Sequence, residues 1–241
     1  MISFKHVLAV CISIFIVGSG VQTFAGTKDN NKKARSASLT TQKQKISYSL
    51  GYNIGNHLKD DFKIDIDSFV KGFKDSHSGV PVLTDEQMKS SILVFQQQIR
   101  KKQMKKVAAL AEKNKAEGAA FLKKNKTRKG VVTLPSGLQY KIIKKGNGTS
   151  PLLTNTVKCN YRGTTLDGKE FDSSYKRGKP AEFEVNGVIK GWKEALQLMK
   201  VGSKWMLYVP SDLAYGDYGA GKTIQPGAAL IFEVELLGIK G

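Results

Sequence analysis

The sequence predicts an α+β protein with a helical first half and a second half built from an antiparallel sheet wrapped around one short helix. Two observations give this fold class. Apolar residues recur every three or four positions from Thr41 to about residue 124, which is the period of a helix. After Gly130 polar and apolar residues alternate instead, which is the period of a strand. The change of period predicts a domain boundary near Gly130.

The first 25 residues are typical of a secretory signal peptide. Lys5 gives a charged start, an apolar run follows from Val7 to Val17, and Thr23-Phe-Ala25 offers small residues at a cleavage site. The apolar run is shorter than the roughly 20 residues that a membrane-spanning helix needs. A lipoprotein signal at Cys11 is the alternative, although few apolar residues precede that cysteine. We expect the mature chain to be exported and soluble.

Removal of such a leader leaves Cys159 as the single cysteine, which excludes an intramolecular disulfide. Cys159 alternates with Val157 and Tyr161 in a strand-like run, so we interpret it as a small buried residue rather than a reactive thiol. The chain has only three histidines, His6, His57 and His77. No cluster of His, Cys and carboxylates has the spacing of metal ligands, so we expect no metal and no cofactor.

The net charge of +19 is concentrated between Arg100 and Lys129, where 12 Lys or Arg residues accompany only Glu112 and Glu117. Such a run could bind nucleic acid or another anionic surface. The chain is expected to be exported, however, and the run contains no aromatic residue besides Phe121. We interpret it as a solvated helix face, and nucleic acid is not an expected partner.

Residues 26–80 are predicted to form an N-terminal helical dimerisation domain. Its first residues, 26 to about 38, are small and polar, which is typical of disorder. A capping box at Thr41-Gln-Lys-Gln44 then begins a helix with one apolar stripe, made of Ile46, Leu50, Ile54 and Leu58. A second short helix is expected from Asp67 to about Ser76. Helices of this length are marginal alone, so we expect the stripe to pair two copies as a homodimer. A loosely folded monomeric cap is the alternative.

Residues 81–129 are predicted to form a long connecting helix. A capping box at Thr84-Asp-Glu-Gln87 begins it, and a helix from residue 85 to about 124 would be about 60 Å long. Past Val107 the pattern is polar nearly all round, which predicts a helix exposed to solvent on every side. The alternative is two helices, broken near Asn114 or Gly118.

Residues 130–241 are predicted to form the sheet domain. Five runs alternate polar with apolar residues, at residues 138–144, 156–162, 182–185, 204–209 and 232–236. One short helix, from about Gly191 to Met199, presents four apolar residues to one side, Trp192, Ala195, Leu196 and Met199. We expect the sheet to wrap across this helix.

Four motifs follow one another in this half of the chain, namely Tyr161-Arg-Gly-Thr-Thr-Leu-Asp-Gly-Lys-Glu-Phe-Asp-Ser-Ser174, Val188-Ile-Lys-Gly-Trp192, Ala214-Tyr-Gly216 and Leu230-Ile-Phe-Glu-Val-Glu-Leu-Leu237. With them the chain resembles the FK506-binding-protein (FKBP) family of peptidyl-prolyl cis/trans isomerases. Three further motifs carry a resemblance to its exported two-domain members, called macrophage infectivity potentiator (Mip) and FkpA-like proteins: Ile46-Ser-Tyr-Ser-Leu-Gly51, Leu134-Pro-Ser-Gly-Leu-Gln-Tyr140 and Pro210-Ser-Asp-Leu-Ala-Tyr-Gly216.

The resemblance implies a catalytic group made of Asp172, Tyr215, Tyr161 and Trp192. It implies substrate-binding roles for Phe171, Arg177, Val188, Ile189, Ile224 and Phe232. Trp192 would be the floor of the pocket, while the Ile189 N–H and the Tyr215 hydroxyl would bind carbonyl groups of the peptide. Ala181 and Ala220 stand where single-domain relatives carry a phenylalanine and commonly a histidine. We therefore expect a wider pocket edge and a changed peptide preference.

The chemistry of prolyl isomerisation fits this composition. The enzyme must lower a rotational barrier of about 18–20 kcal/mol without breaking a covalent bond. The twisted amide is less charge-separated than the planar one, so a dry pocket with aromatic walls favours it relative to water. Such a site needs neither a nucleophile nor a metal.

The resemblance also implies partners and a location. The partners would be unfolded or proline-containing polypeptides, FK506-like and rapamycin-like macrolides, and a second copy of the chain in a homodimer. The location would be the periplasm, the bacterial cell surface or outer membrane, or the medium after secretion. The implied function is to assist folding of extracytoplasmic proteins, with a virulence-associated Mip-like role. The alternative is a dimeric chaperone-type or adhesin-type binding protein in which catalysis is secondary.

Overall fold

The computed structural model describes residues 39–59 and 62–240. The expected signal peptide, Cys11 and the polar segment 26–38 lie outside the described residues. The chain divides into two compact units, residues 1–57 and 58–241, and each is described by itself. Within the described ranges, no helix combines the length and the apolar character needed to cross a membrane.

The first unit contributes helix α2 (Gln42–Leu58). The predicted capping box is present, because the Gln44 N–H donates to Thr41 Oγ1 at 3.2 Å and the Thr41 N–H donates to Gln44 Oε1 at 3.0 Å. None of the helix residues is buried. Ile46 and Leu50, which begin the predicted apolar stripe, are 52% and 61% exposed. The single chain therefore leaves the first half of this stripe uncovered, while Ile54 and Leu58 are half-buried.

The second unit begins with helix α3 (Ile66–Ser78), which starts one residue before the predicted helix and ends two residues after it. Asp65 caps its start by accepting a hydrogen bond from the Ser68 N–H at 2.8 Å. Gly79 ends it with a φ of 73°, a conformation that glycine adopts without steric cost. Phe69 and Phe73 are exposed on this helix.

Helix α4 (Asp85–Asn125) is a single unbroken helix of 41 residues, as the sequence predicts. Its capping box between Thr84 and Gln87 is also present, at 3.2 and 2.9 Å. The alternative of two helices broken near Asn114 or Gly118 is not what the structure contains.

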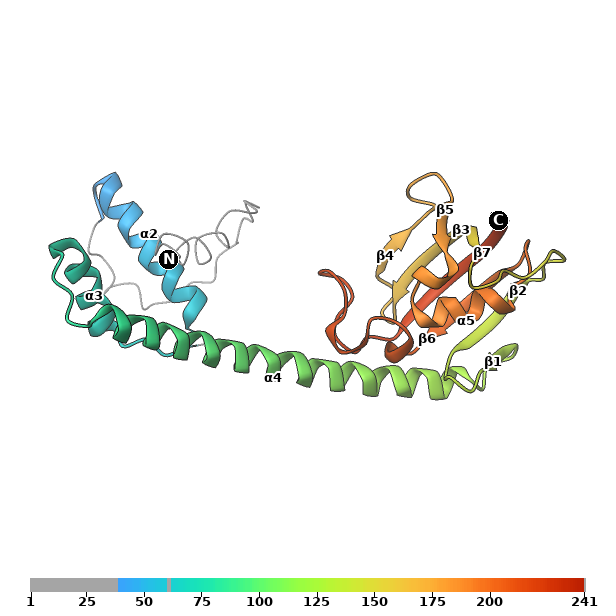
Figure 1. The fold of residues 1–241 in the computed structure, drawn as a ribbon, viewed down its shortest axis with the longest axis horizontal. Coiled ribbons are helices and arrows are strands. Elements are labelled where there is room, and N and C mark those ends of the chain that lie inside the picture. The colour runs from blue at the N-terminus through green and yellow to red at the C-terminus, as the bar shows by residue number, and fades with distance from the viewer. Residues whose placement is uncertain (1–38, 60–61, 241) are drawn as a thin grey trace, which may run out of the picture. The chain divides into compact units, whose positions relative to one another are not determined.

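The prediction that the second half of α4 is exposed on every side is wrong. Ala111, Gly118 and Asn125 are buried, and they recur every seven residues, which keeps them near one face of a helix. This face packs on the sheet domain, alongside which the second half of α4 runs (Figure 1). The fully buried positions of this interface are small or amide residues, and Phe121, which meets the Tyr208 ring at 6.0 Å, is one of few large apolar residues there, so hydrophobic periodicity did not reveal it.

The sheet domain holds a seven-stranded antiparallel sheet in the order β1-β2-β6-β7-β3-β4, with β5 paired to β3. Its strands are β1 (Val131–Thr133), β2 (Gln139–Lys144), β3 (Thr156–Thr165), β4 (Glu170–Ser173), β5 (Ala181–Glu184), β6 (Lys204–Val209) and β7 (Leu230–Lys240). Helix α5 (Lys190–Leu198) crosses one face of the sheet (Figure 1). Three short 3-10 helices complete the domain: η2 (Val185–Gly187), η3 (Ser211–Leu213) and η4 (Gly216–Tyr218). The predicted fold class is confirmed.

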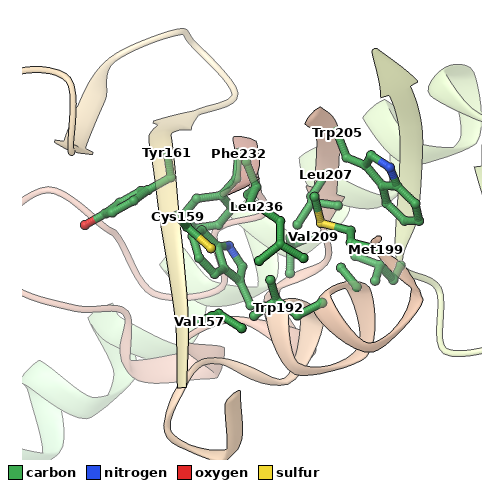
Figure 2. Packing of buried hydrophobic residues seen from close by; sticks show 14 of the residues in the cluster. Val157, Cys159, Tyr161, Trp192, Met199, Trp205, Leu207, Val209, Phe232 and Leu236 are labelled. Carbon is green, nitrogen blue, oxygen red and sulfur yellow. The ribbon is translucent and has the colours of Figure 1, made fainter. Parts of the chain in front are cut away.

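The core lies between α5 and the concave face of the sheet. Trp192 and Met199 from the α5 region meet residues of β3, β6 and β7, as Figure 2 shows for Val157, Cys159, Leu207, Val209, Phe232 and Leu236. Cys159 is fully buried, which confirms its interpretation as a small core residue. This packing fixes Trp192 at the centre of the domain.

Candidate active site

A pocket of about 280 Å³ opens at the edge of this core, between β3, β4, β5 and the start of α5. Six of its ten lining residues are aromatic. The residues that line it are Tyr161, Phe171, Asp172, Phe183, Gly187, Val188, Ile189, Trp192, Tyr215 and Phe232.

Trp192 forms the floor of the pocket and is held by three rings. Tyr161, Phe183 and Phe232 each meet it edge to face, at centroid distances of 5.4, 5.6 and 5.4 Å. Such pairs each contribute about 0.5–1.5 kcal/mol beyond the burial of their area. Trp192 Nε1 is buried and has no hydrogen-bond partner within the described part of the chain. The floor is therefore rigid and poor in polar groups.

Two glycines make room for these rings. A Cβ on Gly163, in β3, would lie 2.6 Å from Cζ of Phe171 and 2.9 Å from Cε1 of Phe232. A Cβ on Gly191 would lie 2.6 Å from Cγ1 of Val209, so the first turn of α5 can approach β6 closely only with glycine there. The missing side chain of Gly163 thus makes room for two pocket rings, and that of Gly191 lets the start of α5 pack against β6.

A polar triad borders the pocket at the end of β4. The Tyr161 hydroxyl donates to Asp172 Oδ2 at 2.5 Å, and Arg177 donates from Nη1 to Asp172 Oδ1 and from Nη2 to the Tyr161 oxygen at 2.7 Å. Figure 2 shows the Tyr161 hydroxyl pointing away from the other labelled residues, while the Tyr161 ring meets Trp192 edge to face. The three side chains hold one another in place at the pocket rim.

This triad sets the charge states at the rim. Partial burial disfavours the charged form of Asp172, but hydrogen bonds from Tyr161 and Arg177 outweigh that effect and hold the pKa of the Asp172 carboxyl below its ordinary value of 3.8. Burial, together with the hydrogen bond to Asp172, raises the pKa of the Tyr161 hydroxyl. Asp172 is therefore an anion and Tyr161 a neutral donor at neutral pH.

Tyr215 lies on the other side of the pocket, immediately before η4, and is 40% exposed. Burial and the nearby negative charge of Asp172 raise the pKa of its hydroxyl. The hydroxyl therefore stays protonated at neutral pH and can donate a hydrogen bond to a bound peptide.

The structure brings most of the sequence-predicted site residues together in this pocket. Two predicted site residues, Arg177 and Ile224, do not line the pocket. Arg177 lies at the rim, where it donates a hydrogen bond to Asp172. Ile224 is buried in the core and pairs in a β-bridge with Ala220. Its side chain belongs to the hydrophobic core and not to the pocket lining.

Phe183, Gly187 and Gly163 are site residues that the sequence reasoning missed. The sequence predicts a missing aromatic residue at Ala181, but Phe183 stands two residues later, on the same face of β5, and its ring lies 5.5 Å from that of Tyr161. The alternation of apolar and acidic residues in β5 places Phe183 on the same face as Ala181, and this pattern could have identified Phe183 from the sequence. In residues 39–59 and 62–240, no group of three His, Cys, Asp or Glu residues could hold a metal ion.

Comparison with known proteins agrees with the geometry. Residues 148–237 match the family described as "FKBP-type peptidyl-prolyl cis-trans isomerase", and residues 43–142 match "Domain amino terminal to FKBP-type peptidyl-prolyl isomerase". "Outer membrane protein MIP" of Legionella longbeachae is 45% identical over 95% of this chain and 97% of that protein. "Peptidyl-prolyl cis-trans isomerase Mip" of Coxiella burnetii is 44% identical over 84% and 89%.

The crystal structure of FkpA from Escherichia coli matches with a TM-score of 0.67 at 37% identity, covering 84% of this chain and 98% of that one. The chain belongs to the FKBP-type peptidyl-prolyl cis/trans isomerases that carry an amino-terminal domain, alongside the Mip and FkpA proteins.

Proposed function

We propose that the pocket around Trp192 is the site at which this isomerase twists Xaa-Pro bonds, and that its substrates are unfolded, exported polypeptides. The observation that carries the proposal is the rigid aromatic floor, on which three rings meet Trp192 edge to face beside the ionised Asp172. The floor fits a proline ring, and the rim fits the flanking peptide.

Each side chain then has one task. The proline ring rests on Trp192 between Tyr161 and Phe232, where water is excluded and the less charge-separated twisted amide is favoured. The Tyr215 hydroxyl and the Ile189 N–H bind peptide carbonyl groups and fix the chain on either side of the rotating bond. Asp172 keeps Tyr161 and Arg177 in place beside that bond.

Competition with a macrolide tests this site. We expect FK506 to inhibit isomerisation of a Xaa-Pro tetrapeptide by the full-length chain competitively, because one aromatic pocket binds both ligands. The variant Trp192→Leu should lose macrolide binding and activity together. Inhibition that leaves the KM for the tetrapeptide unchanged would place the macrolide elsewhere and contradict the proposal.

The proposal includes export and a homodimer. The signal-like first 25 residues support export, and so does the printed name of the Legionella longbeachae relative, an outer membrane protein. The periplasm, the cell surface or outer membrane, and the medium all fit these observations. The dimer is supported by the α2 stripe of Ile46, Leu50, Ile54 and Leu58. Its first two residues are exposed and its last two are half-buried, and exposed apolar side chains on one helix face favour a partner surface.

A second candidate function is client binding by the N-terminal helices of a dimer, with catalysis secondary. It is favoured by Phe69 and Phe73, which are 45% and 63% exposed on α3. A chaperone-type or adhesin-type binding protein would use such side chains to hold unfolded chains or host proteins. Suppression of aggregation by residues 26–108 alone would support it, while a fragment without that effect would contradict it.

A further inference from the structure

The second half of α4 contacts the loop that carries Tyr215. We call residues 214–229 the Tyr215 loop. The side-chain amide of Asn114 donates to the Pro226 carbonyl at 2.7 Å, and Lys115 Nζ forms an ion pair with Asp217 Oδ1 at 2.6 Å. The helix thus holds the loop at two points, one of them two residues after Tyr215.

The backbones of the helix and the loop are also in close contact. A Cβ on Gly118 would lie 3.0 Å from the Cβ of Ala229, and a Cβ on Gly227 would lie 2.2 Å from the Ala111 carbonyl oxygen. Gly227 has a φ of 73°, a conformation in which other residues are strained. The helix therefore fixes the end of the loop as well as its start.

These contacts reach residues that directly follow Tyr215 in the chain. The Gly227 N–H donates to the Gly216 carbonyl at 2.9 Å, which ties the end of the loop to the residue after Tyr215. Asp217, the partner of Lys115, lies in η4, the helical turn that begins directly after Tyr215. A shift of α4 relative to the loop would move the Tyr215 backbone.

The loop has little other support on its helix side. A cleft of about 250 Å³ lies between α4, the β3–β4 turn and the loop, and among the residues that line it are Asn114, Glu117, Asp167, Lys222 and Gln225. The cleft separates loop residues 222–225 from the helix, so the attachment rests on the contacts of Ala111, Asn114, Lys115 and Gly118.

We infer that Asn114, Lys115 and Gly118 of α4 are positioning residues for prolyl isomerisation. They act by fixing the Tyr215 hydroxyl at hydrogen-bonding distance from the substrate carbonyl, and the inference rests on the proposed role of that hydroxyl. A hydrogen bond weakens steeply outside about 2.5–3.2 Å, so a small loop displacement is enough to weaken substrate binding. The long helix is then part of the catalytic unit and not only a connector.

The first experiment compares single and double variants of the full-length chain on a Xaa-Pro tetrapeptide. We expect Asn114→Ala and Lys115→Ala each to lower kcat/KM about three- to tenfold, the size of one hydrogen bond, mainly through KM. Lys113→Ala is the matched control, since Lys113 is exposed on the same helix and its ion pair, with Glu117 at 3.8 Å, lies within that helix. In a Tyr215→Phe background the two helix variants should cause no further loss. Equal losses with and without the Tyr215 hydroxyl, or no loss at all, would overturn the inference.

The second experiment adds a methyl group at position 118 of α4 and then removes one at position 229 of the Tyr215 loop. Gly118→Ala adds a Cβ against Ala229 and should lower kcat/KM, although alanine favours the helix by about 1 kcal/mol and the thermal midpoint should not fall. Adding Ala229→Gly should restore the space and the activity. Loss of activity that follows loss of stability, without rescue in the double variant, would contradict a positioning role.

A third measurement separates this inference from the proposed function. Hydrogen exchange of the Tyr215 loop should become faster in Asn114→Ala, while exchange in β3 and α5 stays as in the parent chain. An unchanged loop would overturn the inference whatever the activities. If Tyr215→Phe alone keeps full activity while the loop does respond, the proposed role of the hydroxyl fails and the attachment of the loop stands.

Discussion

The side-chain amide of Asn125, at the end of α4, donates a hydrogen bond to Gln139 Oε1 on β2 at 2.9 Å, and both side chains are almost fully buried. Gln139 in turn donates from Nε2 to the Leu122 carbonyl of the helix at 2.9 Å. These bonds cross the boundary that the sequence predicts near residue 130. Together with the contact of the Ala111 backbone with Gly227, they support an isomerase domain that begins within α4, before Ala111.

A comparison of two fragments tests this boundary. Residues 130–241 lack Asn125 and should unfold at lower urea concentration than residues 105–241, because Gln139 loses both of its partners. An unpaired buried polar group costs about 1–3 kcal/mol. Asn125→Ala in the full-length chain should reproduce a loss of about that size. Equal stability of the two fragments would restore the boundary near residue 130.

Substitution of Asp172 tests the rim of the pocket. Asp172→Leu should reduce isomerisation of a Xaa-Pro tetrapeptide at least several-fold, because Tyr161 and Arg177 lose their common acceptor. Asp172→Asn keeps the size and an acceptor oxygen but removes the charge, so it separates geometry from electrostatics. Circular dichroism shows whether each variant is folded. A folded Asp172→Leu variant with full activity argues against the assigned site.

The pH dependence follows from the pKa directions at the rim. The pKa of Asp172 is lowered from 3.8, so its contribution is present above about pH 4 and is lost only as the pH falls through the lower folded value. The pKa values of Tyr161 and Tyr215 are raised, so neither ionises below about pH 10. We expect kcat/KM on a tetrapeptide to stay flat from about pH 5 to 9. A bell-shaped profile within that range would require another titrating group.

A charge in the α2 stripe tests the proposed dimer. Ile46→Glu, Leu50→Glu or Ile54→Glu should convert the mature chain from dimer to monomer, because an ionised side chain is costly to bury in an apolar interface. Sedimentation or light scattering measures the mass. Lys45→Glu, which only exchanges one charge for another, should leave the dimer intact. Dimers that persist in all three stripe variants would rule out this interface.

A comparison of substrates tests the purpose of two linked sites. A large unfolded client can reach both pockets of a dimer and gain avidity, whereas a tetrapeptide reaches only one. The full-length chain should therefore exceed residues 105–241 in refolding a proline-limited protein and match that fragment on a tetrapeptide. Any added attraction of acidic clients to the basic stretch Arg100–Lys129 should fade with salt. Equal performance on both substrates would leave the linkage without this role.

The sequence was sufficient for features with strong periodicity. The capping boxes at Thr41 and Thr84, the unbroken α4 and the alternating strands all have local causes, so a single sequence reveals them. The aromatic floor at Trp192 was found through motif resemblance. Long-range contacts between small residues were not found, because Ala111 and Gly118 have no hydrophobic signature and their role depends on the Tyr215 loop, more than a hundred residues away.

The burial of Cys159 has a consequence for the redox behaviour of the protein. Desolvation raises the pKa of its thiol to about 12, so only on the order of one molecule in 10⁵ carries a thiolate there at neutral pH. The thiolate is the species that attacks disulfides and oxidants, and the side chain has no exposed surface through which they could reach it. In an oxidising compartment the folded domain would therefore form no mixed disulfide through Cys159, and only unfolded or newly translocated chains would be vulnerable.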